Sequence, residues 1–458
     1  MRIAVNLIVA LIIAAAPACE RGSSNSQGPY VFNKEEQPHI FFIVVDTLRS
    51  DHLSIHGYAR ATSPNLESIA PKSMVFLNAI SPAPWTLPSF ASILLSKHAF
   101  NHEMNDRNGS AFTGKILPEY LAEKGYLTVS VQTNAFVEPL HNGFSDKYMY
   151  ASAENGIDTR DATAMDQAIE WLDSHDLSNQ KTFMFIGLLA PHWPYDANND
   201  FFPDYVGDEI FISAPERLMS DFGESGDGGM GLLYYNRIPY GIREILGSPA
   251  SGGYYTDARV YTAAYDAEIN NADCQIGRFI EFLKEKKLYD KAMLIITADH
   301  GENNADHEKY FAHGGQSNGL YNSLVHVPLI IKLPNQDRGR EITEYVRSVD
   351  IMPTVLDYLG MAVEGVDGKS LMPIMENTGE VNYEDRPVLS YYKQVGGATK
   401  ELSIIKSGYK LIADTEGKAE LYDLSRDPGE TSNLAAANPA MVEELKAELV
   451  AQSGIGLE

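Results

Sequence analysis

Cysteine is scarce in this chain, whose 458 residues include two, Cys19 and Cys274. Since Cys19 lies in an expected leader, Cys274 is left alone in the rest of the chain, which excludes an internal disulfide. Basic residues are also few: 36 lysines and arginines stand against 62 acidic residues, for a formal net charge of −26. A surface of this sign repels nucleic acid and anionic membranes, so we expect no nucleic-acid partner.

Long hydrophobic runs are also scarce in this sequence. Its N-terminal apolar run, residues 5–13, is too short for a comfortable membrane span, and it lies between Arg2 and the small residues 16–18. This arrangement is typical of a secretory signal. Two processing routes compete: signal peptidase would cut just before Cys19, whereas a lipobox would make Cys19 the lipidated first residue. Lipidation is favoured because a cysteine followed by the polar residues 20–37 is otherwise unexplained.

We therefore expect residues 1–19 to be a signal peptide with a lipobox and residues 20–37 to be a flexible tether. A chain acylated at Cys19 would be an exported bacterial lipoprotein, on the periplasmic face of the outer membrane or on the cell surface. Its contact with the membrane would then be made through the lipid anchor.

Short apolar runs recur beyond this tether, and such continuous runs are typical of strands that are covered on both faces. Stretches with helical periodicity separate them, for example residues 165–172 and 276–283. Strands that alternate with helices predict an α/β sandwich with a large, mostly parallel central sheet. The apolar runs lie at residues 40–45, 182–189, 293–296 and 329–331.

The character of the sequence changes toward its C-terminal end. Two segments between residues 388 and 405 are typical of antiparallel strands, and residues 441–449 are typical of a helix. We therefore expect a catalytic domain over residues 38–375 and a smaller α+β subdomain over residues 376–458. Within the larger domain, the acidic and Gly-rich residues 221–231 predict a surface insertion.

Polar side chains stand directly after several of the apolar runs. Asp46 follows the first run, and His192 comes shortly after the second. Asp299 and His300 follow the third. In open α/β sheets, ligands gather at the carboxyl ends of the strands, so these groups can meet in one crevice. A lone aspartate after a strand is more often a helix cap, but the joint pattern indicates a metal-assisted site.

A hydroxyl nucleophile is indicated by the segment that begins at Thr86. This residue stands two positions before Pro88 and a short apolar stretch, which places it at a helix N-terminus. Free backbone N–H groups and the helix dipole favour an anion at that position. A hydroxyl there, together with two carboxylates and an imidazole, makes up the parts of a metal-assisted nucleophilic site.

Longer motifs resemble the sulfatase family of the alkaline phosphatase superfamily, over nearly all of the chain beyond the tether. Residues 46–52 (Asp-Thr-Leu-Arg-Ser-Asp-His) and 56–58 resemble the family's first metal segment. Residues 299–302 (Asp-His-Gly-Glu), followed by His313, resemble the second. Residues 421–430 resemble a late motif that looks structural. Further matches lie at residues 62–66, 327–330 and 350–354.

The resemblance implies an alkaline-phosphatase-like sandwich and assigns roles by position. Asp46, Asp299 and His300 would bind one divalent metal ion. Thr86 would be its fourth ligand and the nucleophile. Oxygen and nitrogen ligands of this kind favour Zn²⁺ or Mn²⁺, with Ca²⁺ or Mg²⁺ as alternatives.

Four further polar residues have more open roles under this resemblance. His192 and His313 would bind the transferring group or protonate the leaving group. Alternatively, they would hold a second metal ion together with Asp196. One metal ion is favoured because His192 and Asp196 run in the reverse order to the two-metal pattern. Asn134 would donate a hydrogen bond to an oxygen of the substrate, or else be a turn residue.

Several departures from the family pattern bear on the chemistry. Thr86 stands where sulfatases carry the cysteine that is oxidised to formylglycine, and Phe90 replaces an arginine. Residues 132–135 replace a segment that supplies a lysine and a histidine to the sulfate, and Thr47 replaces a second aspartate. Threonine cannot yield the aldehyde by the same modification. An ester formed on Thr86 must therefore be released by attack of water or an acceptor rather than by elimination.

These features predict a metal-dependent hydrolase that cleaves a phosphoester, with a diester favoured, in a small molecule, glycan or lipid. Hydrolysis of a sulfuric ester at the same site is the first alternative. A non-catalytic binding lipoprotein is the second, although a drifted pseudoenzyme would more often have lost one of the expected site residues. The chain keeps Asp46, Thr86, Asp299, His300 and His313.

Overall fold

The structure is a computed structural model, and the part of the chain that it describes begins at Tyr30 and ends at Leu457. The expected signal peptide with Cys19 lies outside the described residues, as do Asp196, the Gly-rich residues 221–231 and His313. The described residues are 30, 32, 37–102, 104–105, 112–150, 160–193, 195, 201, 205, 258–304, 306–307, 311–312, 319–377, 386–393 and 398–457.

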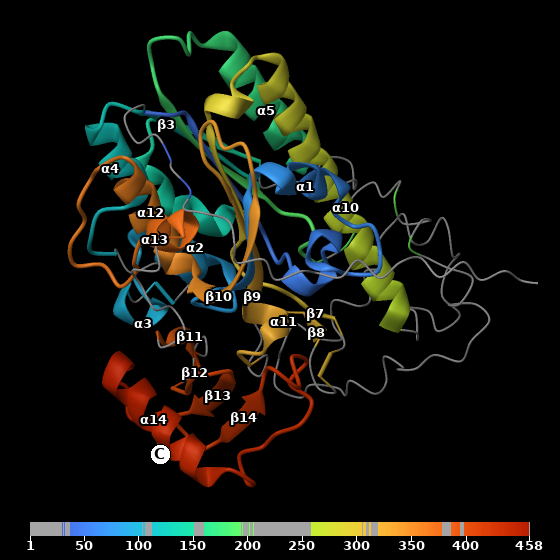
Figure 1. The fold of residues 1–458 in the computed structure, drawn as a ribbon, viewed down its shortest axis with the longest axis vertical. Coiled ribbons are helices and arrows are strands. Elements are labelled where there is room, and N and C mark those ends of the chain that lie inside the picture. The colour runs from blue at the N-terminus through green and yellow to red at the C-terminus, as the bar shows by residue number, and fades with distance from the viewer. Residues whose placement is uncertain are drawn as a thin grey trace, which may run out of the picture.

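An eight-stranded, mostly parallel sheet forms the centre of the molecule (Figure 1). β9 alone among these strands runs antiparallel to both of its neighbours, β2 and β6. This architecture confirms the predicted α/β fold with a large central sheet. In spatial order the strands are β10 (Arg340–Arg347), β2 (Met74–Ile80), β9 (His326–Lys332), β6 (Met293–Ala298), β1 (Ile40–Val45), β5 (Thr182–Leu188), β3 (Leu127–Gln132) and β4 (Asp146–Met149).

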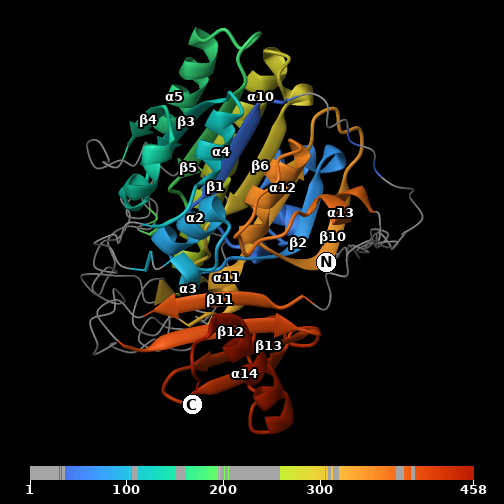
Figure 2. The ribbon, with the colours of Figure 1, turned by 90° about the vertical axis from the view of Figure 1, so that its left-hand side faces the viewer.

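Helices cover both faces of this sheet, as Figure 2 shows from the side. Since both faces are covered, the central strands are buried throughout; β1, for example, exposes none of its six residues. One face carries α1 (Pro64–Ile69), α5 (Arg160–Ser174) and α10 (Ala258–Glu285). The other carries α2 (Thr86–Leu95), α4 (Leu117–Glu123), α12 (Ile351–Tyr358) and α13 (Met372–Glu376).

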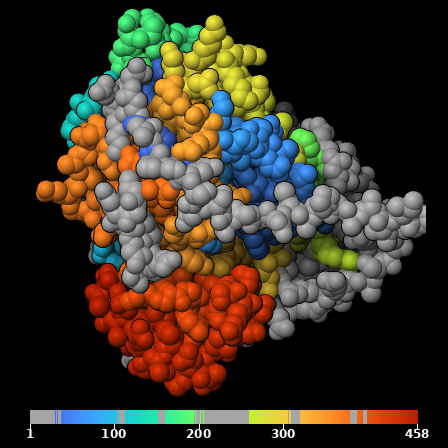
Figure 3. All heavy atoms as spheres, in the orientation of Figure 1, coloured from blue at the N-terminus to red at the C-terminus, as the bar shows by residue number. Residues whose placement is uncertain are grey.

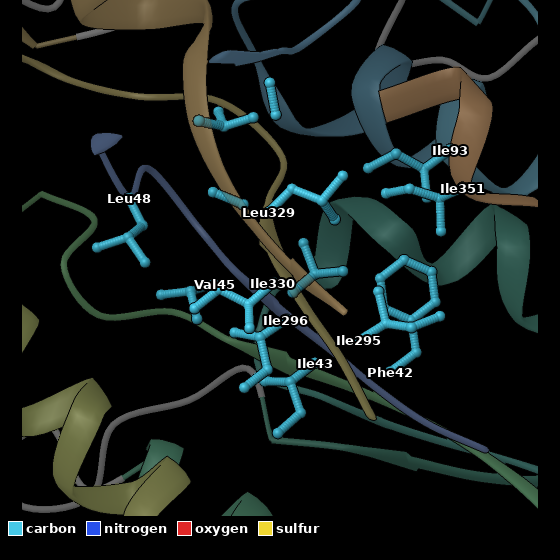
Figure 4. Packing of buried hydrophobic residues seen from close by; sticks show 14 of the residues in the cluster. Phe42, Ile43, Val45, Leu48, Ile93, Ile295, Ile296, Leu329, Ile330 and Ile351 are labelled. Atoms are coloured by element: carbon cyan, nitrogen blue, oxygen red, sulfur yellow. The ribbon is translucent and has the colours of Figure 1, made fainter. Parts of the chain in front are cut away.

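The core between these layers is aliphatic and aromatic. Figure 4 shows Phe42 and Ile43 of β1 close to Ile295 and Ile296 of β6. Phe42 also contacts Phe185 of β5 edge-on, with ring centroids 5.2 Å apart. Branched and aromatic side chains of this kind fill the surface of a covered parallel sheet, which fixes the register of the three central strands.

Several strands of the central sheet were not predicted from the sequence. β3 alternates apolar residues with polar ones, and Thr128, Ser130 and Gln132 are nevertheless buried. β10 lies at the edge of the sheet and exposes part of its polar residues. β2, beside it, is half-buried at two positions. Polar residues therefore hide β3 and β10 from a search for apolar runs, whereas β2 was missed although its first four residues are apolar.

A four-stranded antiparallel sheet lies below the main body, as expected for the C-terminal part. The helix α14 (Pro439–Ser453) packs on it, and Figure 3 shows this part as a continuous mass in red. Its strands are β11 (Val388–Lys393), β12 (Lys400–Lys406), β13 (Tyr409–Asp414) and β14 (Ala419–Asp423). None of the helices in the described part of the chain combines the length and hydrophobicity that a membrane-spanning segment needs.

Candidate active site

The ends of two neighbouring strands bring the candidate metal ligands together. β1 pairs in parallel with β6, and Val45 lies level with Ala298. The next residues along the two chains are Asp46 and Asp299, so their side chains emerge at the same edge of the sheet. Together with His300 they form a buried group whose potential ligand atoms all lie within 4.8 Å of one another.

Each carboxylate uses one oxygen for orientation and turns the other toward His300. Asp299 Oδ1 accepts hydrogen bonds from the backbone N–H of His300 at 2.7 Å and of Thr47 at 3.2 Å. Asp46 Oδ2 accepts one from Asn134 Nδ2 at 2.6 Å. The other oxygens, Asp46 Oδ1 and Asp299 Oδ2, each lie 3.5 Å from His300 Nε2.

The tautomer of His300 also suits a metal ligand. Its Nδ1–H donates to the carbonyl oxygen of Gly301 at 2.8 Å, so the Nε2 lone pair faces the two carboxylates. Histidines that bind metals commonly donate their second ring N–H to a carbonyl group in this way.

Electrostatics favour a cation between these groups. Burial, and secondly the charge of Asp46, raise the pKa of Asp299 well above its ordinary value. Asp299 Oδ2 is buried and accepts no hydrogen bond from the described residues. A divalent cation would remove the repulsion and occupy that oxygen, so the residues present fit a metal ion.

Thr86 is the first residue of α2, as predicted, and its side chain reaches the same centre. Thr86 Oγ1 lies 3.4 Å from His300 Nε2 and is almost entirely buried. Pro88 is tolerated in the first turn because its missing N–H has no intrahelical acceptor there. One turn later, Ser89 Oγ donates to the carbonyl oxygen of Asp299 at 2.5 Å and so connects α2 to the loop that carries Asp299 and His300.

Thr47 holds the turn between the first ligand and Arg49. Its φ is 57°, in the left-handed region, which is costly for a β-branched residue. The Tyr265 hydroxyl donates to Thr47 O at 2.6 Å and accepts from Arg49 N at 3.0 Å. Tyr265 was not among the predicted site residues, because a tyrosine on the apolar face of α10 reads as core.

Arg49 is buried behind this turn, and neighbouring carboxylates neutralise its charge. Its guanidinium forms two hydrogen bonds with Asp51, at 2.9 and 2.7 Å, and also pairs with Asp306. These partners raise the pKa of Arg49 against the effect of burial. Arg49 therefore joins the first metal segment to the residues that follow the second.

Residues 132–135, which depart from the family pattern, contribute one side chain to the site. Gln132 Nε2 donates to Phe185 O at 3.2 Å, and Thr133 Oγ1 donates to Gly187 O at 3.0 Å. Both side chains are thus bonded to the backbone of β5. Asn134 is the exception, since it bonds to Asp46. The residue expected either to bind substrate or to stand in a turn orients a candidate metal ligand in this structure.

His192 lies in the turn after β5. Its Nδ1–H donates to the carbonyl oxygen of Trp193, which leaves Nε2 as the atom able to accept a proton. His313, expected to act with His192 on the transferring or leaving group or to hold a second metal ion with it, lies outside the described residues, and so does Asp196, which was expected only in the second-metal alternative. The described residues with the geometry of a metal site are those around His300.

Comparison with known proteins identifies the family. The site combines two carboxylates, an imidazole and a hydroxyl, all buried at the carboxyl edge of a parallel sheet. Metal-dependent hydrolases use groups of this kind. The sulfatase family model matches residues 38–361, and the model of the N-sulphoglucosamine sulphohydrolase C-terminal region matches residues 317–453. The chain belongs to the sulfatase family.

Individual relatives are distant. Arylsulfatase K of Danio rerio is 25% identical over 295 residues, which are 62% of this chain and 55% of that protein. The chain therefore spans about half the length of this relative. A solved structure in complex with D-glucosamine-2-N,6-O-disulfate is similar with a TM-score of 0.71 and 21% identity, covering 92% of this chain and 98% of the other.

A second class of enzyme shares the fold. The phosphonate monoester hydrolase of Agrobacterium radiobacter is similar with a TM-score of 0.71 and 19% identity. The match covers 91% of this chain and 96% of that one. The same scaffold therefore carries enzymes named for sulfate esters and enzymes named for phosphonate esters.

Proposed function

We propose that this protein is an exported, metal-dependent hydrolase that cleaves a phosphoester, with a diester favoured, through Thr86. The observation that carries the proposal is the position of Thr86 Oγ1, which lies 3.4 Å from His300 Nε2 at the start of α2. A nucleophile at that point faces the candidate metal ligands and the free N–H groups of the first helical turn.

Asp46, Asp299, His300 and Thr86 would hold the metal ion. Two carboxylate oxygens, an imidazole nitrogen and a hydroxyl favour Zn²⁺ or Mn²⁺. A bound divalent cation would supply positive charge against the anionic group that is transferred.

The covalent chemistry belongs to Thr86. Its Oγ gives up its proton and forms a bond to phosphorus while the bond from phosphorus to the alcohol of the substrate breaks, and the alcohol takes up a proton as it leaves, so that the step has no net change in protons. Water then attacks the same phosphorus and releases Thr86 Oγ, which regains its proton. His192 is the candidate proton donor to the leaving alcohol once its Nε2 has taken up a proton, with Nδ1 fixed by Trp193 O.

Two features support a phosphoester over a sulfate ester. The Thr86 ester has no second hydroxyl through which to eliminate the group, so release depends on in-line attack, which suits phosphorus. In addition, Gln132 and Thr133 are bonded to β5 and offer no positive charge to a sulfate. The similarity in fold to an enzyme named as a phosphonate monoester hydrolase also supports a phosphorus ester as substrate.

Hydrolysis of a sulfuric ester on a glycan is the second candidate. The observation that favours it is the similarity of the chain to known proteins: its relatives include arylsulfatases, and one similar solved structure is in complex with its substrate D-glucosamine-2-N,6-O-disulfate. A glycan or other small molecule is the expected substrate in either case.

The deciding measurement compares matched aryl esters. We expect kcat/KM for an aryl phosphodiester to exceed that for the corresponding aryl sulfate by at least ~100-fold, which is about 2.7 kcal/mol of transition-state stabilisation. Mass spectrometry of the same preparation must show unmodified Thr86. Equal or higher activity on the sulfate would overturn the phosphoester proposal and leave the sulfatase one.

A further inference from the structure

Among the contacts between the C-terminal sheet and the main body, two connect to segments that carry candidate site residues. On one side, Ser390 Oγ of β11 donates to Ser81 O at 2.6 Å, and Tyr391 N donates to Pro82 O at 2.9 Å. These residues lead into Thr86. Ser81 Oγ in turn donates to the carbonyl oxygen of Asp299.

On the other side, a buried ion pair reaches α11 (Asn322–Val325). Lys410 Nζ of β13 lies 2.7 Å from Glu430 Oε1, and both side chains are at most 1% exposed. Lys410 Nζ also donates to Asn322 Oδ1 at 2.9 Å, while Asn322 N donates to Glu430 Oε2 at 2.5 Å. Figures 1 and 2 both show α11 between the central sheet and the C-terminal strands.

α11 is packed directly against the turn that carries the candidate ligands. Gly301, the residue after His300, donates its N–H to Leu324 O at 2.7 Å. A β-carbon at Gly301 would lie 2.0 Å from Ser323 O, so the two backbones are in closest contact there. Ser323 Oγ also donates to Asn303 Oδ1. A displacement of Asn322 would therefore be transmitted through α11 to Gly301 and to the adjacent His300.

The chemistry of the pair indicates positioning rather than stabilisation. Burial lowers the pKa of Lys410 and raises that of Glu430, so each charge is disfavoured by its surroundings and compensated by the other. Such buried pairs add little net stability compared with apolar residues of similar size. They do fix one geometry, because both partners and Asn322 must be in place at once.

We propose that Lys410 and Glu430 are positioning residues for the metal site: through Asn322 and Gly301, the C-terminal sheet sets the geometry of Asp299 and His300. This inference rests on the proposed metal site and not on the identity of the ester. It gives the late motif at residues 421–430, which looks structural from the sequence, a role in the chemistry.

The test measures Zn²⁺ binding to the metal-free full chain by competition with a chelating dye, together with Tm. Lys410→Met removes one charge, and the double variant Lys410→Met with Glu430→Leu removes both. The control for the loss of a paired lysine in the same sheet is Lys406→Met on β12; this lysine forms a partly exposed pair with Glu448 of α14 at 3.2 Å.

Both Lys410 variants should bind Zn²⁺ at least ~10-fold more weakly than the wild type, as is typical when a group that orients a metal ligand is lost. Tm should fall in the single variant and recover in the double one, while Lys406→Met keeps full Zn²⁺ affinity. If Zn²⁺ affinity recovers with Tm in the double variant, or falls equally in Lys406→Met, the positioning role is refuted. Because no substrate is used, these results do not depend on which ester is cleaved.

Discussion

Asn134 makes two hydrogen bonds that a single substitution removes together. Its Nδ2 donates to Asp46 Oδ2 at 2.6 Å, and its Oδ1 accepts from Phe136 N at 2.9 Å at the start of the 3-10 helix Ala135–Gly143. Asn134→Ala therefore releases one oxygen of a candidate metal ligand and also uncaps a helix. The first loss acts on metal binding, and the second acts on stability.

The two effects differ in size and can be measured separately. A hydrogen bond that orients a metal ligand is typically worth 10- to 100-fold in metal affinity, which corresponds to about 1.4–2.7 kcal/mol. Loss of a side-chain cap costs about 1 kcal/mol of unfolding free energy. We expect Asn134→Ala to raise the Kd for Zn²⁺ by at least ~10-fold and to lower stability by that smaller amount.

Asn438 supplies the matched control. Its side chain accepts from Met441 N at the start of α14, so Asn438→Ala removes a cap of the same kind far from the site. It should lower stability to a similar degree and leave the Kd for Zn²⁺ unchanged. If Asn134→Ala loses stability alone and binds Zn²⁺ like the wild type, Asn134 is a cap and the reasoning about Asp46 fails. A rise in KM at full metal occupancy would instead support contact with substrate.

Three further outcomes are expected. Thr86→Ala should lower kcat by on the order of 10³-fold or more in a folded protein, and wild-type activity in that variant would remove the nucleophile assignment. Elemental analysis should find one divalent metal ion per chain, and this ion should be lost when Asp46, Asp299 or His300 is changed to alanine. Full metal occupancy in all three variants would refute the site. Two ions per chain in the wild type would favour a second metal site. Mass spectrometry of the mature N-terminus should find an acylated Cys19, whereas a chain starting there without acyl groups would be a secreted protein without an anchor.

The fold was predictable where burial leaves a continuous apolar signal. β1, β5 and β6 are each covered on both faces, and their runs were recognised as strands. β3 is buried as well, yet Ser130 and Thr128 interrupt its run, and Thr128 is bonded to Ser145 in the neighbouring turn. Those bonds depend on residues distant in sequence, which periodicity does not capture.

The candidate site was predictable to the same degree. Asp46, Asp299 and Thr86 follow directly from strand ends and a helix start, because these positions are local. The groups that orient them are not local: Tyr265 bonds to the Thr47 turn from the long helix α10, and Ser89 bonds to Asp299 O from within α2. No spacing in the sequence marks such contacts, since the partners of Tyr265 are backbone atoms more than 200 residues away.

The contacts of β3 also explain why the site cannot be returned to the family pattern by one substitution. A β-carbon at Gly187 would lie 2.0 Å from Gln132 Oε1, so the glutamine occupies the space that the glycine leaves free on β5. Thr133 is buried, and its Oγ1 donates a hydrogen bond to the carbonyl oxygen of the same glycine. A lysine at position 133 would have to leave that buried place before its charge reached the substrate. The absence of the lysine and histidine that the family supplies to sulfate is therefore linked to the packing of β3 on β5. Asn134, which follows Thr133, connects this packed segment to Asp46 by a hydrogen bond.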